Sequence, residues 1–449
     1  MDLSAPRRLA DAGAGRGGPV KAPLRLLALI AACAASAASS LPQTVQKLTL
    51  QEAEQTAVQN HPRIQAAMNL ASAAKAQVTQ ARSAYYPTIY GSLTGADAQS
   101  NSRIAAGALN NPIIYDRYAN GVTVSQLITD FGRTHELVKS SNLRAQAQQE
   151  TVVITRADVL LQVDAAYFAA LKAQAVLAVA QETVKARQLA SDQVTELAKN
   201  KIKSDLDVSF ANVNLAQAQL LLIQSQNDLQ SSFARLSAAL GYSDQRTFEL
   251  VEQPMPPALP MDLAALIQQA LKDRPELVGQ QLTVKSAQSY ATAERDLKLP
   301  TISALGAAGL VPYNAPPLAP RYAAAGFNVN IPIFNGRLFS ALQSEATSRA
   351  QAENQYLRDL QNQIVRDVQT AWLNANSAFQ RLSVTERMLN QANQALDLAQ
   401  GRYSLGLSSI IELSQAELNQ TSARIEQASA MYDYQAQYSV LNYQLGALR

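Results

Sequence analysis

The chain has 449 residues, 38 of them basic and 35 acidic, which gives a formal net charge of +3. Basic and acidic residues are interspersed rather than gathered into blocks, so the sequence lacks an electrostatic footprint for nucleic acid, and we exclude nucleic-acid binding. Charged residues make up only 16% of the chain, and Gln, Asn, Ser and Thr supply much of its polarity. Such a composition is unusual for a cytosolic enzyme.

Residues 1–38 have the layout of a secretory signal peptide. Basic residues precede the apolar run LLALIAACAA, and the small-residue stretch SAAS follows it, as a signal peptide requires. This run of about ten residues is too short to remain in a bilayer as a spanning helix. We therefore predict that the chain is exported.

Two ways of processing this signal are open. Residues 30–33 (IAAC) resemble a bacterial lipobox, which would place a lipid on Cys33, the only cysteine of the chain. Residues 35–37 (ASA) instead fit cleavage by ordinary signal peptidase. Because VKAPLRLLALIAACAASA is itself a well-proportioned signal, our hypothesis is that the chain begins at Val20.

The exported part of the chain contains two copies of one unit. LTLQEAEQTAVQNHPRIQAA at 48–67 matches MDLAALIQQALKDRPELVGQ at 261–280, and DAAYFAAL at 164–171 matches QTAWLNAN at 369–376. Internal repeats of this kind indicate one duplicated architecture rather than two unlike domains. We predict a first structural repeat over 46–240, a Pro-rich connector over 241–260 and a second repeat over 261–447.

Each repeat is predicted to run helix, strand, strand, very long helix, short break, helix. The long helices are expected over 134–199 and 338–403, neither of which contains a proline. Each would extend for roughly 100 Å at 1.5 Å per residue, too long for a compact globule. Pro62 and Pro275 indicate helix starts in the first turn, and we expect the side chains of Asn60 and Asp273 to cap these helices.

Short alternating stretches precede both long helices. VTVS at 122–125 and FNVN at 327–330 place apolar and small polar residues on opposite faces of a strand, and we expect the second of these strands to continue through Ile331 and Ile333. This alternation is typical of a transmembrane β-barrel, with lipid on one side and water on the other. Soluble hairpins with one buried face are the alternative.

Tyrosines gather near the ends of these strands, where an aromatic girdle of a membrane barrel would lie: Tyr85, Tyr86, Tyr90, Tyr115, Tyr118, Tyr313 and Tyr322. Four strands cannot close a barrel, and an open strand edge is not tolerated in lipid. A membrane protein with this sequence must therefore form oligomers.

The duplication, the corners DFGR at 130–133 and FNGR at 334–337, and RYSLGLSSIIELSQAELN at 402–419 together resemble the TolC-like outer-membrane efflux channel family. The resemblance implies a homotrimer with a twelve-stranded transmembrane β-barrel in outer-membrane lipid, continued by an α-helical barrel across the periplasm. It also implies a passive exit duct for efflux or type I secretion. Its partners would be a periplasmic membrane-fusion adaptor and an inner-membrane pump of the RND or ABC type.

The resemblance carries three groups of site residues. The strand-to-helix corners would consist of Asp130, Gly132 and Arg133 in the first repeat and Asn335, Gly336 and Arg337 in the second. The family usually carries two adjacent glycines at the second corner, whereas Gly336 stands alone here. We therefore expect the turn geometry to differ between the two corners.

The break after each long helix corresponds to the family's periplasmic tip, which contacts the adaptor. These tips would be Lys201, Ile202 and Lys203 in the first repeat and Leu405, Gly406 and Leu407 in the second. Because Lys201 stands near the position where the second tip has its glycine, we expect unequal adaptor contacts. The alternative is that both segments are only helix–helix turns.

An acidic ring at the periplasmic aperture is the third group. Asp397 matches an acidic family position and Gln400 stands where the family has a second acid; the internal repeat adds Asp192 and Glu196. Rings of carboxylates favour cations over anions in pores. The alternative is that these charges lie on ordinary solvated helix faces.

The sequence carries no pattern of an enzyme. Its only histidines, His61 and His135, begin no metal-ligand motif, and there is no Gly-rich phosphate loop or nucleophile elbow. We expect no catalytic residue, metal or cofactor. The alternative function is a periplasmic coiled-coil adaptor or scaffold, which should show one helical hairpin flanked by compact β-rich domains rather than two equal hairpins.

Overall fold

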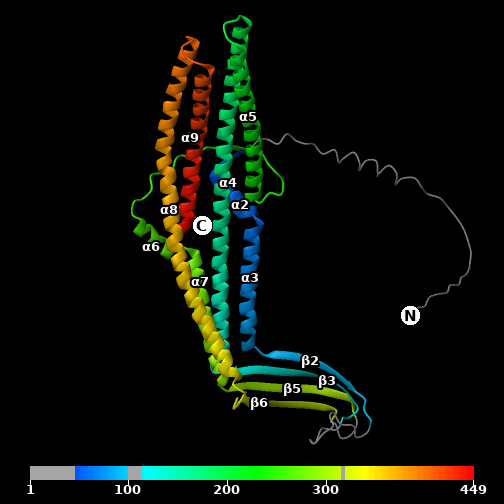
Figure 1. Ribbon diagram of the computed structural model, residues 1–449. Coiled ribbons are helices and arrows are strands. Elements are labelled where there is room, and N and C mark those ends of the chain that lie inside the picture. Colours follow the sequence, from blue (N-terminus) through cyan, green and yellow to red (C-terminus); the bar gives the residue numbers. More distant parts are fainter. Residues whose placement is uncertain (1–45, 100–113, 315–318, 449) are drawn as a thin grey trace, which may run out of the picture. The chain divides into compact units, whose positions relative to one another are not determined.

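The computed structural model describes residues 46–99, 114–314 and 319–448 (Figure 1). The predicted signal peptide and Cys33 lie outside the described residues. The first half of the described chain contains β1 (Gln46–Leu48), α2 (Leu50–Asn60), α3 (Pro62–Arg82), η1 (Ser83–Tyr85), β2 (Thr88–Ala96), β3 (Arg117–Thr129), α4 (Arg133–Lys199) and α5 (Asp205–Ala239). The second half contains β4 (Phe248–Leu250), α6 (Leu263–Asp273), α7 (Pro275–Arg295), η2 (Asp296–Lys298), β5 (Thr301–Asn314), β6 (Arg321–Asn330), α8 (Leu338–Ser404) and α9 (Ile410–Gln444).

The two halves match helix by helix. The helices form pairs of equal length: 11 residues in α2 and α6, 21 in α3 and α7, 67 in α4 and α8, and 35 in α5 and α9. Two strands lie between the second and third helix of each half. The predicted pair of strands, the very long helix, the break and the last helix of each repeat are confirmed, but two helices rather than one precede the strands.

The four long strands form one antiparallel sheet in the order β2-β3-β5-β6 (Figure 1). The repeats join at its centre, where β3 pairs with β5. Gly309 permits this close pairing, because a Cβ atom there would lie 2.3 Å from the Asn120 carbonyl oxygen and 2.6 Å from the Tyr322 side chain. Within the described residues, β2 and β6 each pair on one side only.

The helices that adjoin the strands pack in a matching order, α3 against α4, α4 against α7 and α7 against α8. The repeats again join at the centre, between α4 and α7. There the Ser140 hydroxyl donates to the Ser286 carbonyl at 2.9 Å, and the Ser286 hydroxyl donates to the Ser140 carbonyl at 2.8 Å. Two small buried side chains therefore bring these helix backbones close together.

Helices α4 and α5 form one hairpin, and α8 and α9 form the other. The larger hydrophobic core lies where α2, β1, β4 and α5 pack on α4, with Val163, Tyr167 and Leu236 fully buried. The Tyr167 hydroxyl lies 2.8 Å from the Leu48 carbonyl oxygen and 2.6 Å from that of Val251. It thus fixes the short β1–β4 sheet, which the sequence did not predict and whose second strand lies inside the predicted connector.

The predicted helix caps were wrong. Asn60 is the last residue of α2 and Asp273 the last of α6. The cap of α3 is His61, whose Nδ1 accepts from the Arg63 N–H at 3.2 Å. The one-residue links between these helix pairs place the cap directly before the proline.

The predicted extension of β6 was also wrong. The strand ends at Asn330, and residues 331–335 have no regular structure. Pro332 explains this end, because proline has no N–H to donate to a sheet.

Candidate functional site

The predicted apolar residues of the strands share one face of the sheet. Across the registers, Ile89 pairs with Val124, Val122 with Ala308, and Ala304 with Phe327, and directly paired residues lie on the same face. The opposite face carries mainly polar and small residues, among them Thr88, Ser125, Ser303 and Asn328. Leu93 is 74% exposed and Phe327 80% exposed, so the described residues do not cover this apolar face.

The tyrosines divide into two groups along the strands. Tyr85, Tyr86 and Tyr90 lie at the helix-proximal end. Tyr118 pairs with Tyr313 at the far end, and Tyr322 pairs with Gly309 nearby. The strands between them have 9 to 14 residues, which covers the roughly 9–11 residues that a tilted strand needs to span a bilayer.

Both strand-to-helix corners use two successive residues with positive φ. These are Phe131 (φ 59°) and Gly132 (φ 112°) in the first repeat, and Gly336 (φ 63°) and Arg337 (φ 71°) in the second. The expected difference in turn geometry was therefore wrong in this respect. The glycine occupies the second position of the pair in one corner and the first position in the other, so Arg133 corresponds in structure to Leu338 rather than to Arg337.

Asp130 organises the first corner. Its carboxylate accepts from the Thr134 N–H at 2.7 Å, the Thr134 hydroxyl at 2.5 Å and the Gly132 N–H at 3.3 Å. A guanidinium nitrogen of Arg133 lies 4.0 Å from a carboxylate oxygen of Glu294. Asn335 holds the equivalent place before Gly336, and the Leu338 N–H donates to its carbonyl at 3.2 Å. The predicted corner residues therefore lie together in each repeat, between a strand and a long helix.

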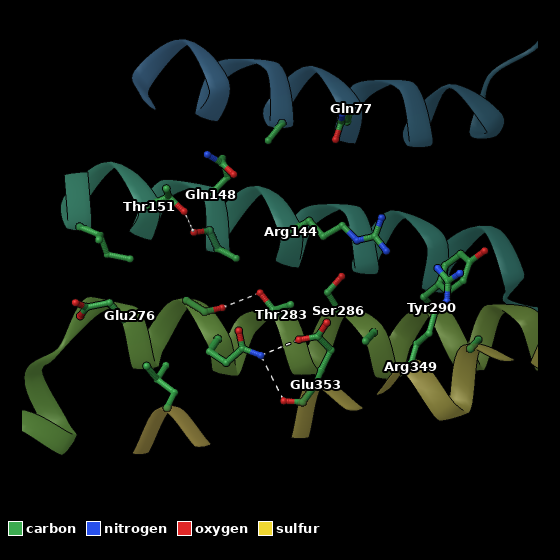
Figure 2. Close-up of a pocket in the computed structure, with 18 residues that line it drawn as sticks. Gln77, Arg144, Gln148, Thr151, Glu276, Thr283, Ser286, Tyr290, Arg349 and Glu353 are labelled. Atoms are coloured by element: carbon green, nitrogen blue, oxygen red, sulfur yellow. Dashed lines mark hydrogen bonds between the residues drawn. The ribbon is translucent and has the colours of Figure 1, made fainter. Parts of the chain in front are cut away.

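A hollow of about 910 Å³ opens between α3, α4, α7 and α8 (Figure 2). Most of its labelled side chains are polar, and the Arg144 guanidinium lies 5.8 Å from the centre of the Tyr290 ring. The Gln280 amide donates to the Glu353 carboxylate at 2.8 Å. This helical layer thus presents a polar, water-compatible surface, which the sequence did not specify residue by residue.

Both tips have the same backbone. Lys201 (φ 57°) takes the left-handed position that Gly406 (φ 71°) takes in the second tip. The Ile202 N–H donates to the Leu197 carbonyl and the Leu407 N–H to the Arg402 carbonyl, the pattern of a Schellman helix end. Lys201 is therefore the conformational counterpart of Gly406.

The predicted tip residues differ in how they meet solvent. Ile202, Leu405 and Leu407 are 66%, 75% and 66% exposed. Lys203 instead turns back to the other hairpin, where its Nζ lies 3.6 Å from the centre of the Tyr403 ring. The tips therefore present bare apolar side chains on both hairpins, while Lys203 joins the hairpins.

The predicted aperture acids lie near the tips. Asp192 and Glu196 line one hollow on α4; Asp192 accepts from the Gln188 amide at 2.9 Å, and Glu196 pairs with Lys199 at 2.7 Å. Asp397 and Gln400 are exposed and one turn apart on α8. The structure thus brings together the two members of each pair, each pair on its own hairpin.

Ion pairs between α4 and α9 form a seam that the sequence did not predict. Lys172 pairs with Asp433 at 3.0 Å, Glu182 with Arg424 at 2.9 Å, and the largely buried Arg187 with Glu417. Since the partners are more than 200 residues apart, no local pattern relates them. We call these six residues the α4–α9 seam.

The described residues contain no group of three or more His, Cys, Asp or Glu side chains that could hold a metal ion.

Helices α4 and α5 are long and apolar enough to cross a membrane by length and composition alone. In the most apolar 18-residue segment of α4, 44% of the residues are buried within the protein; in that of α5, only 11% are buried. The apolar segment of α5 therefore offers apolar surface that no described part of the chain covers.

The family model described as outer membrane efflux protein matches residues 53–242 and 266–447. TolC of Escherichia coli K12 is 22% identical over 91% of this chain and 84% of its own length. The toluene efflux pump outer membrane protein TtgC of Pseudomonas putida is 25% identical over 84% of this chain and 78% of its own length. The crystal structure of VceC from Vibrio cholerae superposes with a TM-score of 0.74 at 17% identity, covering 88% of this chain and 96% of that one.

Proposed function

Because the chain belongs to the outer membrane efflux protein family, we propose that it is the outer-membrane exit duct of a tripartite efflux or type I secretion system. It lies in the outer membrane and extends into the periplasm, and it conducts cargo passively from a pump to the exterior. The observation that carries this proposal is the four-stranded sheet, whose apolar face is uncovered and whose two edges are unpaired within the part of the chain that the structure describes. Such a sheet is unsuited to water and becomes stable in lipid only when its edges are paired.

The strands, rather than α4, are assigned to the bilayer. The apolar segment of α4 packs against the protein core, whereas the described residues leave the apolar face of the sheet uncovered. Pairing of β2 in one copy with β6 in the next would close a barrel. Three copies of four strands give twelve, which agrees with the homotrimer that the family resemblance implies.

Two exposed stripes support the same assembly at the level of the helices. Their residues recur at alternating spacings of four and three, as in a coiled coil. The stripe on and before α5 consists of Ile202, Leu206, Ser209, Val213, Ala216, Leu220 and Ile223, and that on α8 of Val384, Met388, Gln391, Ala395, Leu398, Arg402 and Leu405. Each stripe is exposed along its whole length in the single chain.

The internal duplication pairs these stripes. Equal helix lengths place α8 as the counterpart of α4 and α5 as the counterpart of α9. Since α4 packs on α9 within the chain, α8 is expected to pack on α5 of the next copy. The counterparts of Glu182 and Arg424 in the α4–α9 seam are Arg387 and Gln219, which lie beside the two stripes.

Cysteine cross-linking tests this assembly. Leu220→Cys with Met388→Cys should link neighbouring copies into covalent dimers and trimers on mild oxidation, because both positions lie at similar distances from the tips. Asn390 lies about 200° around α8 from Met388, so Leu220→Cys with Asn390→Cys is the matched control and should remain monomeric. Equal cross-linking of both variants would contradict the pairing.

Membrane fractionation and channel recording test the function itself. The full-length protein should be recovered from the outer membrane, migrate as an oligomer in unboiled detergent gels, and conduct ions in planar bilayers. Recovery as a soluble periplasmic monomer would instead favour an adaptor or scaffold. That alternative is already disfavoured by the family membership and by the two hairpins of equal length.

We further propose that the exposed tips contact the periplasmic adaptor. Leu405 and Leu407 with Gly406 form one contact, and Ile202 with Lys201 and Lys203 forms the other. Leu405→Ser should weaken co-purification with the adaptor more than Lys201→Ala, because it removes more exposed apolar surface. If the two variants recover equal amounts of the adaptor, the two tip segments are only helix–helix turns and not adaptor contacts.

The aperture ring is the last part of the proposal. Among the described carboxylates near the tips, Asp397 is exposed without an ion-pair partner, whereas Glu412 pairs with Arg402 at 3.1 Å. Asp397→Asn should therefore weaken the block of the channel by multivalent cations, and Asp192→Asn with Glu196→Gln should do so to a lesser degree. If Glu412→Gln weakens the block and Asp397→Asn does not, the ring lies on α9 and the assignment to Asp397 is wrong.

A further inference from the structure

The hollow between α3, α4, α7 and α8 lies on the concave side of a single layer of helices. These helices pack in the order α3, α4, α7, α8, yet residues from all four line the hollow, among them Gln77, Gln148, Thr283 and Arg349 (Figure 2). A cavity that reaches every helix of one layer must lie on the side toward which the layer curves. In the closed assembly proposed above, that side faces the passage.

One end of the hollow carries an arginine from each repeat. Arg144 lies eleven residues after the start of α4, and Arg349 lies eleven residues after the start of α8, so the two occupy equivalent positions. Both residues are exposed and line the end of the hollow where Tyr290 lies (Figure 2). At 1.5 Å per residue they lie about 16 Å along the helix from the strand-to-helix corners. Three copies would place six such arginines at one level of the passage.

The arginine of α4 lacks an opposing charge. Arg144 forms no ion pair with any described carboxylate, and its guanidinium lies 5.8 Å from the centre of the Tyr290 ring. The carboxylates in and beside the hollow are bound to other groups. Glu276 pairs with Arg274 at 2.7 Å, Glu294 pairs with Arg133 at 4.0 Å, and Glu353 accepts from the Gln280 amide at 2.8 Å. Arg144 therefore keeps N–H donors for a molecule in the passage.

The arginine of α8 has only a weak ion pair. Arg349 lies 2.6 Å from Glu345, one turn earlier on α8, and their side chains are 73% and 52% exposed. Exposed ion pairs contribute little to stability and are screened by salt, so a dissolved anion can compete with Glu345 for Arg349. The equivalent position on α4 is Ser140, whose hydroxyl donates to a carbonyl of α7. Each copy thus brings two arginines and one exposed carboxylate to this end of the hollow.

Guanidinium groups bind carboxylates and phosphates through pairs of N–H donors. We propose that Arg144 and Arg349 of the assembled copies form an anion-binding collar inside the duct, which attracts cargo that carries carboxylate or phosphate groups. This inference rests on the proposed function, because the concave side faces a passage only in the closed assembly. The collar lies beside the sheet, whereas Asp192 and Asp397 lie near the tips. An anion added from the outer side therefore reaches the collar before it meets those acids.

Planar-bilayer recordings with inositol hexakisphosphate, a compact polyanion, test the collar. Added from the outer side, this anion should reduce the current through the wild-type channel, and rising salt should weaken the block. Arg144→Gln with Arg349→Gln should weaken the block several-fold, whereas Arg144→Lys with Arg349→Lys keeps the charge and should retain most of it. The matched control is Arg358→Gln, because Arg358 is exposed and lies nine residues after Arg349, on the opposite face of α8.

The outcomes separate the collar from the function on which it rests. An unchanged block in the glutamine double variant, or an equal loss of block in Arg358→Gln, would overturn the collar. If the wild type conducts ions but the polyanion does not block it, the collar is wrong and the proposed function stands; if the wild type forms no channel, both are wrong. Each variant is first checked for migration as an oligomer in unboiled gels, and Arg144→Gln alone replaces the double variant if that variant fails to assemble.

Discussion

The two repeats use the same backbone at their corners and tips but different residues to make it. Lys201 takes the left-handed conformation of Gly406, and the corner glycine is the second residue of the positive-φ pair in the first repeat and the first residue of the pair in the second. A left-handed conformation costs a non-glycine residue about 1–2 kcal/mol, so neither repeat uses glycine at every position that favours it. The duplicated architecture therefore constrains the conformation of each turn more strongly than its residue.

The largest expected difference between the repeats lies in the α4–α9 seam. Arg187→Ala would leave Glu417 buried without a cation, and we expect a loss of about 3–5 kcal/mol in the free energy of unfolding. The counterparts of these residues are Ala392 and Asn212, so Ala392→Ser should change stability little. Urea unfolding of the detergent-solubilised protein measures both.

The double variant Arg187→Met with Glu417→Leu sharpens this test. Replacing both charges by apolar side chains should recover most of the stability that Arg187→Ala loses. If the double variant is as unstable as the single one, the buried pair has a role that apolar packing cannot replace.

Substitutions of the corner glycines should have the next largest effect on stability. Gly132 has φ 112° and Gly336 has φ 63°, and only the second value is close to the left-handed region that other residues adopt. We expect Gly132→Ala to destabilise the protein by about 1–3 kcal/mol and Gly336→Ala by less. Thermal unfolding of the two variants side by side gives the order, and a larger effect at Gly336 would contradict it.

The tips should show a smaller, reciprocal effect. Lys201→Gly removes a non-glycine residue from a left-handed position and should stabilise the first tip by about 1 kcal/mol, whereas Gly406→Lys should cost the second tip about the same. Hydrogen exchange in the last turns of α4 and α8 measures these changes locally. Exchange changes of the same sign in both variants would contradict the equivalence of the two tips.

The pH dependence of the helix cap formed by His61 should be the smallest of these effects on stability, and Arg274 at the equivalent position should show no such dependence. Burial lowers the pKa of His61, and the nearby Arg63 lowers it further. Protonation removes the Nδ1 acceptor that caps α3, so the cap stabilises the fold above pH 6.5 and is lost as the pH falls through the pKa of the folded state.

Replacing His61 by asparagine tests this contribution. Asparagine caps a helix without titrating, and a lost cap costs about 1 kcal/mol. We expect His61→Asn to exceed the wild type in thermal midpoint at pH 5 and to approach it at pH 7.5. A constant difference at both pH values would exclude titration of the cap.

The sequence predicted those features whose cause is local. The proline-free segments after each corner predicted α4 and α8 to within a residue, and alternation predicted which strand residues share the apolar face. It did not predict the β1–β4 sheet, which depends on Tyr167 contacting Leu48 and Val251, or the α4–α9 seam, whose partners are distant in sequence. The helix caps were misplaced because polar residues flank Pro62 and Pro275 at more than one position.

The equal lengths of paired helices make the length of one depend on the other. Each residue of an α-helix contributes about 1.5 Å of rise and 100° of rotation. Deleting one residue from the middle of α8 would therefore rotate every side chain from the deletion to Leu405 by more than a quarter turn relative to α9. A matching deletion in α4 would restore the equal lengths of the two hairpins but would not reverse this rotation, so insertions and deletions in this chain should be tolerated only by whole heptads.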